Sequence, residues 1–388
     1  MLFYTLLFLC TAFIILITNL LKQDRQKRII YISLPLSLLI YILWFIGVFL
    51  ISGLRFELGG SDYYIYREGF EAIPKLWELN QLGDSIENIK LVNNFEIGYL
   101  LFNSFVKTLG FNFYGFTVIE SAIWYLCMYH GLKRYINDWA IVLPVFLYKL
   151  FFYNTFISLR QSITIAIFFV SWRLIQDKKI IKYYLLCILA LLFHNGAIIL
   201  FVVYPVMQFK LTKKRLLILN VIAWSMFLID KLGFSIFVMI NAILERIPSE
   251  STIIFKAKQW MSMNMPISIF HIAEYMLLML LVIICFDKII EKDSNSEFVL
   301  KIFTCLLPIF AIFSGNVVST RFKDYFTITY GIILMYLCQI DEGRKKYIVQ
   351  LCTVAICAYG YFRYIINFDA GGLMPYVTFV SKGIGIFN

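Results

Sequence analysis

The chain has 388 residues, of which 61% are hydrophobic and 15% are charged, and its mean hydropathy is +0.79. This composition excludes an ordinary soluble domain. The net charge of +11 would suit nucleic acid, but the basic residues cluster at the ends of apolar segments, where anionic lipid headgroups are the expected partner. The sequence therefore predicts an all-α, polytopic integral membrane protein and no nucleic-acid binding.

Apolar segments of about 20 residues, the length that crosses a bilayer core of about 30 Å, recur along the chain. We predict about 12 transmembrane helices, all within a single transmembrane domain of residues 1–388. They cover residues 1–21, 29–53, 112–132, 139–156, 161–177, 181–194, 196–210, 215–232, 267–287, 297–315, 322–340 and 346–366. The first run lacks a cleavage pattern of small residues, so we expect it to stay as an anchor.

Two stretches admit a second interpretation. Residues 181–210 form one apolar run interrupted at 194–196, which also fits a short helix pair that does not fully cross the membrane. Residues 233–245 fit a segment that lies on the membrane surface.

Basic residues follow alternate apolar segments and define the expected orientation. They occur at 22–28, 133–134, 178–182, 210–215, 288–292 and 344–346. The positive-inside rule places these ends in the cytoplasm. Both termini then lie outside, as do two longer outer loops: residues 54–111, with a juxtamembrane helix, and residues 233–266.

The cysteines and histidines predict no metal centre. All eight cysteines lie in or at the ends of apolar segments, so we expect small core residues and no disulfides. His130, His194 and His271 form no pair with the spacing of a zinc site. We expect no cofactor, and acidic groups alone would hold Mg²⁺ only weakly.

Polar side chains gather at the outer ends of the predicted helices, although they come from distant places in the chain. They are Arg55, Asp62, Glu96, Arg160, Gln161, His194, Asn195, Arg321 and Asp324. A charge near the hydrocarbon costs a few kcal/mol, so charges there usually line a cavity or form pairs. Three arginines at one face suit an anion, because the planar guanidinium binds phosphate better than an ammonium group does.

Each of these residues also has a structural interpretation. Arg160 and Arg321 would equally extend toward lipid phosphates. His194 fits a turn residue at a helix end, and Asp62 and Glu96 fit ordinary loop acids.

Two further charges, Glu120 and Lys149, fall inside predicted helices, toward the outer half of the membrane. They either pair and fix helix packing or line a cavity. We favour the structural role.

Five short motifs carry a family resemblance through their order along the chain. They are Arg55-x6-Asp62-Tyr63-x2-Tyr66-x3-Phe70, Glu96-Ile97-Gly98-Tyr99, Leu159-Arg160-Gln161-Ser162, Leu192-Phe193-His194-Asn195-Gly196-Ala197 and Ser319-Thr320-Arg321-Phe322-x2-Tyr325. Together they resemble the EpsG/Wzy family of bacterial exopolysaccharide and O-antigen polymerases, with a GT-C-like architecture. The family's usual proline after the acid is replaced by Ile97.

The resemblance implies a glycosyltransferase in the bacterial cytoplasmic (inner) membrane, with its active site on the outer face. The donor would be a growing glycan on undecaprenyl diphosphate, and the acceptor a repeat unit on the same lipid. The implied transfer is inverting and metal-independent. The implied partners are the undecaprenyl-diphosphate-linked oligosaccharide, membrane lipid, a chain-length regulator and a flippase.

Roles for the motif residues follow from this chemistry. Arg160 and Arg321, with Arg55 as third choice, would hold the diphosphate as negative charge develops on it. Asp62 or His194, with Glu96 as a further candidate, would take the proton of the acceptor hydroxyl. Sugar binding is assigned to Tyr63, Tyr66, Tyr99, Gln161 and Tyr325, although aromatic residues are enriched at any membrane interface.

Three other activities stay open. An O-antigen ligase would share the donor but move finished glycan to a lipid A core. A transporter or flippase of lipid-linked oligosaccharide would have a similar number of helices, yet its polar groups should lie near the bilayer midplane. A membrane acyltransferase would need a donor site on the cytoplasmic face. The identity and linkage of the sugars and the oligomeric state do not follow from the sequence.

Overall fold

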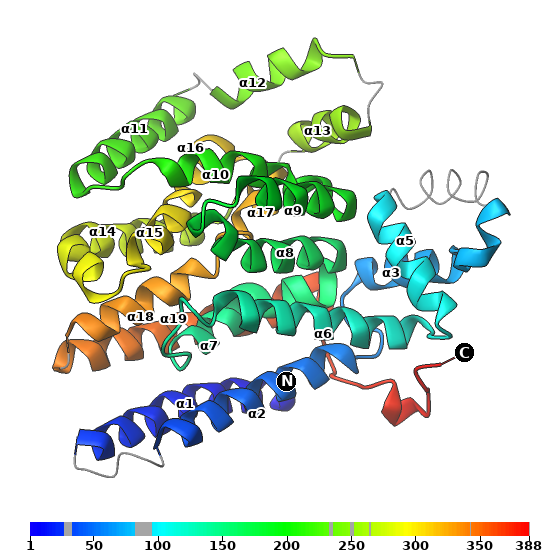
Figure 1. Ribbon diagram of the computed structural model, residues 1–388, viewed down its shortest axis with the longest axis horizontal. Helices are drawn as coiled ribbons and strands as arrows, with labels where there is room; N and C mark the ends of the chain where they lie inside the picture. The colour runs from blue at the N-terminus through cyan, green and yellow to red at the C-terminus, as the bar shows by residue number, and fades with distance from the viewer. Residues whose placement is uncertain are drawn as a thin grey trace. The chain divides into compact units, whose positions relative to one another are not determined.

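The computed structural model describes residues 1–26, 33–81, 95–232, 236–248, 252–263, 265–341 and 343–387. Within these ranges the regular secondary structure is helical, and β-structure is limited to two isolated bridges. The predicted all-α class is confirmed. Figure 1 shows the helices and their order along the chain.

Five helical segments among the described residues are long and apolar enough to cross a membrane. They are Leu2–Leu21 in α1 (Leu2–Gln26), Leu36–Gly53 in α2 (Ser33–Gly53), α14 (Ile269–Lys292), Ser296–Phe313, and α19 (Arg344–Asn367). Shorter apolar helices cover Val142–Phe151, Ile180–Phe193, Asn195–Gln208 and Thr329–Ile340. The protein is thus a helical membrane protein, whereas the predicted number of spans is not confirmed. Part of the difference arises because some predicted spans are divided into shorter helical pieces, as in 139–156, where the structure has only the shorter apolar helix Val142–Phe151 and a π-turn after it.

Contacts divide the chain into two compact units. Unit 1 contains Met1–His194 and Tyr347–Asn388, and unit 2 contains Asn195–Lys346.

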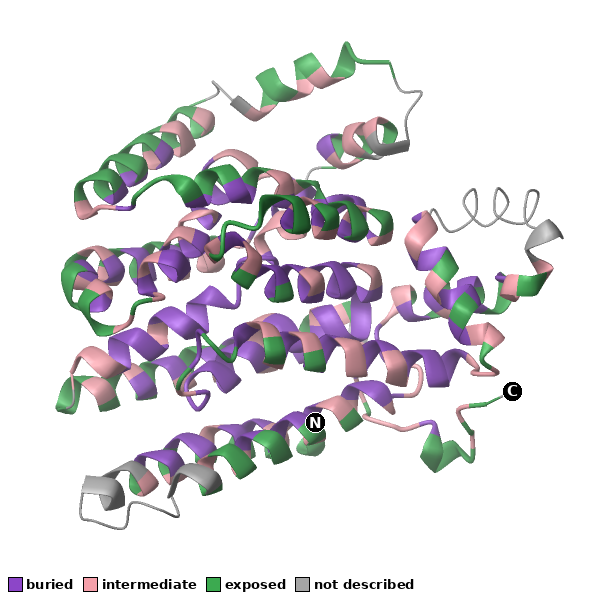
Figure 2. Cartoon of the chain, in the orientation of Figure 1, coloured by how far each residue is buried: buried purple, intermediate pink, exposed green. Residues whose placement is uncertain are grey.

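Unit 1 contains α1, α2 and α19, together with α3 (Ser61–Ala72), η1 (Leu76–Gln81), α5 (Ile97–Thr108), α6 (Phe113–Leu132), α7 (Val142–Phe146), α8 (Leu159–Gln176) and α9 (Ile180–Phe193). Its most extensive helix pairs are α6 with α8, α8 with α9, and α2 with α6. Buried positions dominate α8 along most of its length (Figure 2).

Two π-helical turns connect α7 to α8 in place of a regular helix. They are η2 (Leu147–Phe151) and η3 (Tyr153–Ile157). Ser158 leaves the helical conformation with φ −106° and ψ 61°, and α8 begins at the next residue. Arg160 therefore lies in the first turn of a new helix. Single π-turns of this kind often occur at functional sites.

Unit 2 consists of η4 (Asn195–Ile199), α10 (Leu200–Gln208), α11 (Lys213–Lys231), α12 (Ile236–Glu245), α13 (Thr252–Ser262), α14, α15 (Ser296–Thr304), α16 (Leu306–Phe313), α17 (Val317–Lys323) and α18 (Thr329–Ile340). Its most extensive pairs are α11 with α16 and α14 with α18. The ring of Tyr275 lies 4.9 Å from that of Phe303 and 5.0 Å from that of Phe310, so aromatic packing fills this core. The predicted second outer loop contains α12 and α13.

Candidate functional site

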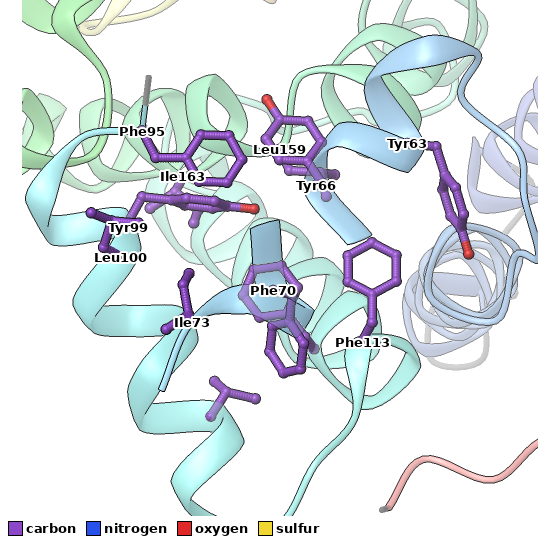
Figure 3. Close-up of a cluster of buried hydrophobic side chains, with 12 residues drawn as sticks. Tyr63, Tyr66, Phe70, Ile73, Phe95, Tyr99, Leu100, Phe113, Leu159 and Ile163 are labelled. Atoms are coloured by element: carbon purple, nitrogen blue, oxygen red, sulfur yellow. The ribbon is translucent and has the colours of Figure 1, made fainter. Parts of the chain in front are cut away.

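In the described part of the first predicted outer loop, the α-helices α3 and α5 pack against each other on unit 1 (Figure 1). Tyr63, Tyr66 and Phe70 recur at helical spacing and form the buried face of α3. They belong to one aromatic cluster with Phe95 and Tyr99, and Figure 3 shows Phe70 in the middle of this cluster. The aromatic residues of the motif that opens this loop therefore form a packed core beneath the loop.

Lys107 of α5 ties the two helices together. Its Nζ donates to the carbonyl oxygens of Glu71 at 2.7 Å and Ile73 at 2.6 Å, and lies 3.3 Å from that of Phe70. These are carbonyls at the C-terminal end of α3, which lack partners within the helix. Burial lowers the pKa of the Lys107 amine, while Glu78 acts in the opposite direction. The contact positions α3 at the end that lies away from Asp62.

Arg160 forms the central ion pair of the candidate site. Its Nη1 lies 2.5 Å from Oε2 of Glu96, and its Nε lies 3.5 Å from the hydroxyl of Tyr66. The guanidinium also lies over the ring of Phe95, 4.9 Å from its centroid. The Arg160 side chain remains 20% exposed, against 7% for that of Glu96. A partly accessible cation is thus held by a buried carboxylate among aromatic rings.

Gly98 explains how Glu96 and His194 come into one region of unit 1. A Cβ at Gly98 would lie 2.8 Å from the carbonyl oxygen of Leu192 and 2.9 Å from its Cβ, so only glycine allows this approach of α5 to α9. Glu96 precedes α5 as its N-cap, and His194 follows α9 as its C-cap. The His194 N–H donates to the carbonyl of Ala190 at 3.0 Å, and the residue is buried.

Asp62 is the second residue of α3 and is partly exposed. The turn before it passes so close to η3 that a Cβ at Gly59 would collide with the carbonyl oxygen of Phe156. Gly59 and Gly60 have φ values of 137° and 65°, which favour glycine. The position of Asp62 is consequently set by a glycine turn packed on the π-helical segment.

Arg55 differs from Arg160 in being completely buried. Its Nη1 donates to the carbonyl of Ser52, and its guanidinium lies 5.2 Å from the ring centroid of Phe156. Nε and Nη2 have no hydrogen-bond partner among the described residues. Its electrostatic partner is Glu120, which accepts a hydrogen bond from Ser162. These contacts favour a packing role, and diphosphate binding by Arg55 stays a prediction.

The side chains predicted to bind sugar are also buried. Tyr63, Tyr66, Tyr99 and Gln161 are all buried in unit 1, and burial raises the pKa of the Tyr63 phenol. Their rings and amide contribute to packing, and sugar binding through them stays a prediction. The exposed aromatic residues described in this region include Tyr64, Phe105 and Trp77, of which Trp77 is 65% accessible. Nζ of Lys75 lies 5.3 Å from the ring centroid of Trp77. Trp77 lies outside the five motifs, but as an aromatic residue of the first outer loop it is also a sequence candidate for stacking on a sugar ring, which stays a prediction.

Arg321 and Tyr325 belong to unit 2. Arg321 lies in α17 and is partly exposed, whereas Tyr325 is buried. Asn316 caps α17 by accepting from the N–H of Val318 at 2.8 Å, and its Nδ2 donates to the carbonyls of Met261 and Met263 at 2.9 Å. The segment that carries Arg321 is thus anchored to the end of α13.

The ion pair next to Arg321 involves its neighbours along the chain. Nζ of Lys323 lies 2.6 Å from Oδ1 of Asp324, which is buried. Within the described ranges, no group of three His, Cys, Asp or Glu side chains is placed to hold a metal ion.

Helices of membrane-spanning length identify a helical membrane protein, and its candidate site is a partly exposed arginine among aromatic rings. The chain matches the model of the EpsG family over residues 38–378 and belongs to that family. The resemblance drawn from the motifs is confirmed, and membership places the chain among membrane proteins of the polysaccharide-polymerase type. No curated protein and no solved structure matches the chain.

Proposed function

We propose that the protein is a glycosyltransferase that polymerises a polysaccharide carried on undecaprenyl diphosphate, at the outer face of the cytoplasmic membrane. The growing glycan is transferred from its lipid diphosphate to the terminal sugar of a lipid-linked repeat unit. Family membership supports the polymerase class. The observation that carries the mechanism is the partly exposed Arg160 guanidinium, held on Glu96 among aromatic rings.

The transfer exchanges one bond for another at the anomeric carbon. A hydroxyl oxygen of the acceptor forms the new bond, while the bond from that carbon to the diphosphate oxygen breaks and its electron pair leaves with undecaprenyl diphosphate. The acceptor proton passes to a base. Negative charge grows on the diphosphate in the transition state, so a fixed cation that contacts it lowers the barrier.

Arg160 is suited to that task by its surroundings. The rings of Phe95 and Tyr66 exclude water from one side of the guanidinium, and this strengthens its attraction for phosphate oxygens. The guanidinium donates at several positions, so Nη1 can stay on Glu96 while other nitrogens bind the diphosphate. Arg321 is proposed as the second cation.

Glu96 is better suited to positioning Arg160 than to accepting the proton. One of its oxygens is already paired with Nη1 at 2.5 Å, and protonation would weaken that pair. The base is then Asp62 or His194, and the other of these two residues positions sugar hydroxyls.

The test uses the purified protein and a defined undecaprenyl-diphosphate-linked repeat unit. We expect a ladder of longer lipid-linked products. Arg160→Lys should lower the rate of ladder formation at least about 100-fold, because the ammonium group of lysine cannot reproduce the planar, bidentate hydrogen bonding of the guanidinium. Arg173→Lys, on the exposed part of the same helix, is the matched control and should keep full activity.

Three outcomes would contradict the proposal. Full activity of Arg160→Lys would remove Arg160 from diphosphate binding. Absence of a ladder together with measured transport of the substrate would favour a flippase. Transfer only to a lipid A core acceptor would favour a ligase.

A further inference from the structure

The C-terminal segment, residues 368–387, runs antiparallel to the chain that leads from α2 into α3, and we call it the strap. Three main-chain hydrogen bonds join the two segments: Phe379 N–H to Leu54 O at 3.0 Å, Phe56 N–H to Val377 O at 2.9 Å, and Gly59 N–H to Gly372 O at 3.2 Å. The side chains of Leu373 and Phe379 are fully buried and anchor the strap. The strap is thus an integral part of unit 1.

The strap also supplies the N-terminal cap of α3. The N-cap residue of this helix is Gly60, which has no side chain to accept a hydrogen bond. The first N–H groups of a helix need such an acceptor, and a negative charge there is favourable. Oδ2 of Asp369 accepts from the N–H of Ser61 at 3.0 Å. A residue 308 positions away in the sequence thereby replaces the local cap.

The backbone on both sides is adapted to this contact. A Cβ at Gly60 would collide with the Asp369 carboxylate, and one at Gly372 would lie 3.2 Å from the Cα of Gly60. Asp369 itself has φ 43°, a left-handed conformation that Asn, Asp and Gly adopt more readily than other residues. The close approach of the strap to α3 therefore depends on residue types at three positions.

We propose that Asp369 is a positioning residue for glycosyl transfer, because it fixes the first turn of α3 and with it Asp62. This inference rests on the proposed function, in which Asp62 contacts the acceptor sugar. Asp62 follows Ser61 directly, so fraying of the first turn would displace the Asp62 carboxylate. Displacement of a reacting group by about 1 Å is enough to lower a rate strongly.

Two variants distinguish loss of the Asp369 hydrogen-bond acceptor from a change in its left-handed backbone conformation. Asp369→Gly keeps the left-handed conformation but removes the acceptor, whereas Asp369→Asn keeps both. Hydrogen exchange of the peptide that contains Ser61 should be about fivefold faster in Asp369→Gly than in the wild type, and unchanged in Asp369→Asn. The turnover rate in the ladder assay should fall in Asp369→Gly, at an unchanged KM for the donor, and be restored in Asp369→Asn.

The two readouts distinguish failure of this inference from failure of the proposed function. Wild-type exchange at Ser61 in Asp369→Gly, or equal loss of turnover in both variants, would overturn the inference. If the wild type makes no ladder from any repeat unit, the proposed function fails. In that case faster exchange in Asp369→Gly alone still supports the cap, and unchanged exchange overturns it.

Discussion

At the residue scale, the ion pair of Arg160 and Glu96 raises the question of which partner does chemistry. The pair joins residues 64 positions apart, and its carboxylate is the more buried member. Removing one partner of such a pair leaves the other poorly solvated, so both side chains contribute to the site even if only the guanidinium contacts the substrate.

Substitution of Glu96 distinguishes positioning from base catalysis. If Glu96 positions Arg160, Glu96→Gln should stay within about tenfold of the wild-type rate, because the amide oxygen still accepts from Nη1. Glu96→Ala should lower the initial rate of ladder formation at least about 100-fold, the range expected when a catalytic group is misplaced. Initial rates of ladder formation measure both.

A base role predicts a different pattern. The amide of glutamine cannot take a proton, so Glu96→Gln would then be as inactive as Glu96→Ala. That outcome would return Glu96 to the candidates for the base, beside Asp62 and His194.

At the element scale, the approach of α5 to α9 at Gly98 determines whether the site forms. The sequence assigns chemistry to Glu96 and Tyr99 of this motif, but Gly98 between them makes the contact with Leu192. Sequence alone could not show this, because the partner helix begins more than 80 residues further along the chain.

We expect Gly98→Ala to destabilise unit 1 by roughly 1 to 3 kcal/mol, since the added methyl group would overlap backbone atoms that have little room to move. Gly47→Ala is the matched control: Gly47 lies inside α2, and apart from the nearby backbone of that helix, no atom of the described residues comes within 4 Å of an added Cβ. That change should be neutral or stabilising by up to about 1 kcal/mol. Thermal unfolding of the purified variants in detergent compares them, and equal midpoints would show that the contact is unimportant.

The segment between α7 and α8 illustrates a second limit at this scale. Hydropathy predicts one span over 139–156, whereas this region contains the short α7 followed by two π-turns, the second of which ends at Ile157. Apolar composition is the same for α- and π-turns, so a hydropathy pattern does not distinguish them. This interruption of the helix at Ser158 matters for the candidate site, because it places Arg160 in the first turn of α8.

At the scale of the whole molecule, the orientation in the membrane decides which leaflet supplies the substrate. The basic clusters predict that Lys182 faces the cytoplasm and that Trp77 faces outward. Both side chains are exposed on unit 1.

Cysteine labelling in intact cells tests this orientation. In a background without the eight native cysteines, Trp77→Cys should react with a membrane-impermeant maleimide, and Lys182→Cys should react only after the cells are opened. The reverse pattern would place the candidate site at the cytoplasmic face and exclude polymerisation at the outer face.

The sequence by itself determined the class of protein, because hydropathy and charge are local properties that add along the chain. The sequence also indicated the family and most residues of the candidate site, because each motif is a short continuous stretch that can be recognised by itself. The tertiary structure decided which of these residues are accessible: Arg160 remains partly exposed on Glu96, while Arg55 and the motif tyrosines are buried. It likewise revealed the cap from Asp369 to Ser61. These pairings depend on the packing of segments far apart in the chain, and no local pattern of residues encodes that packing.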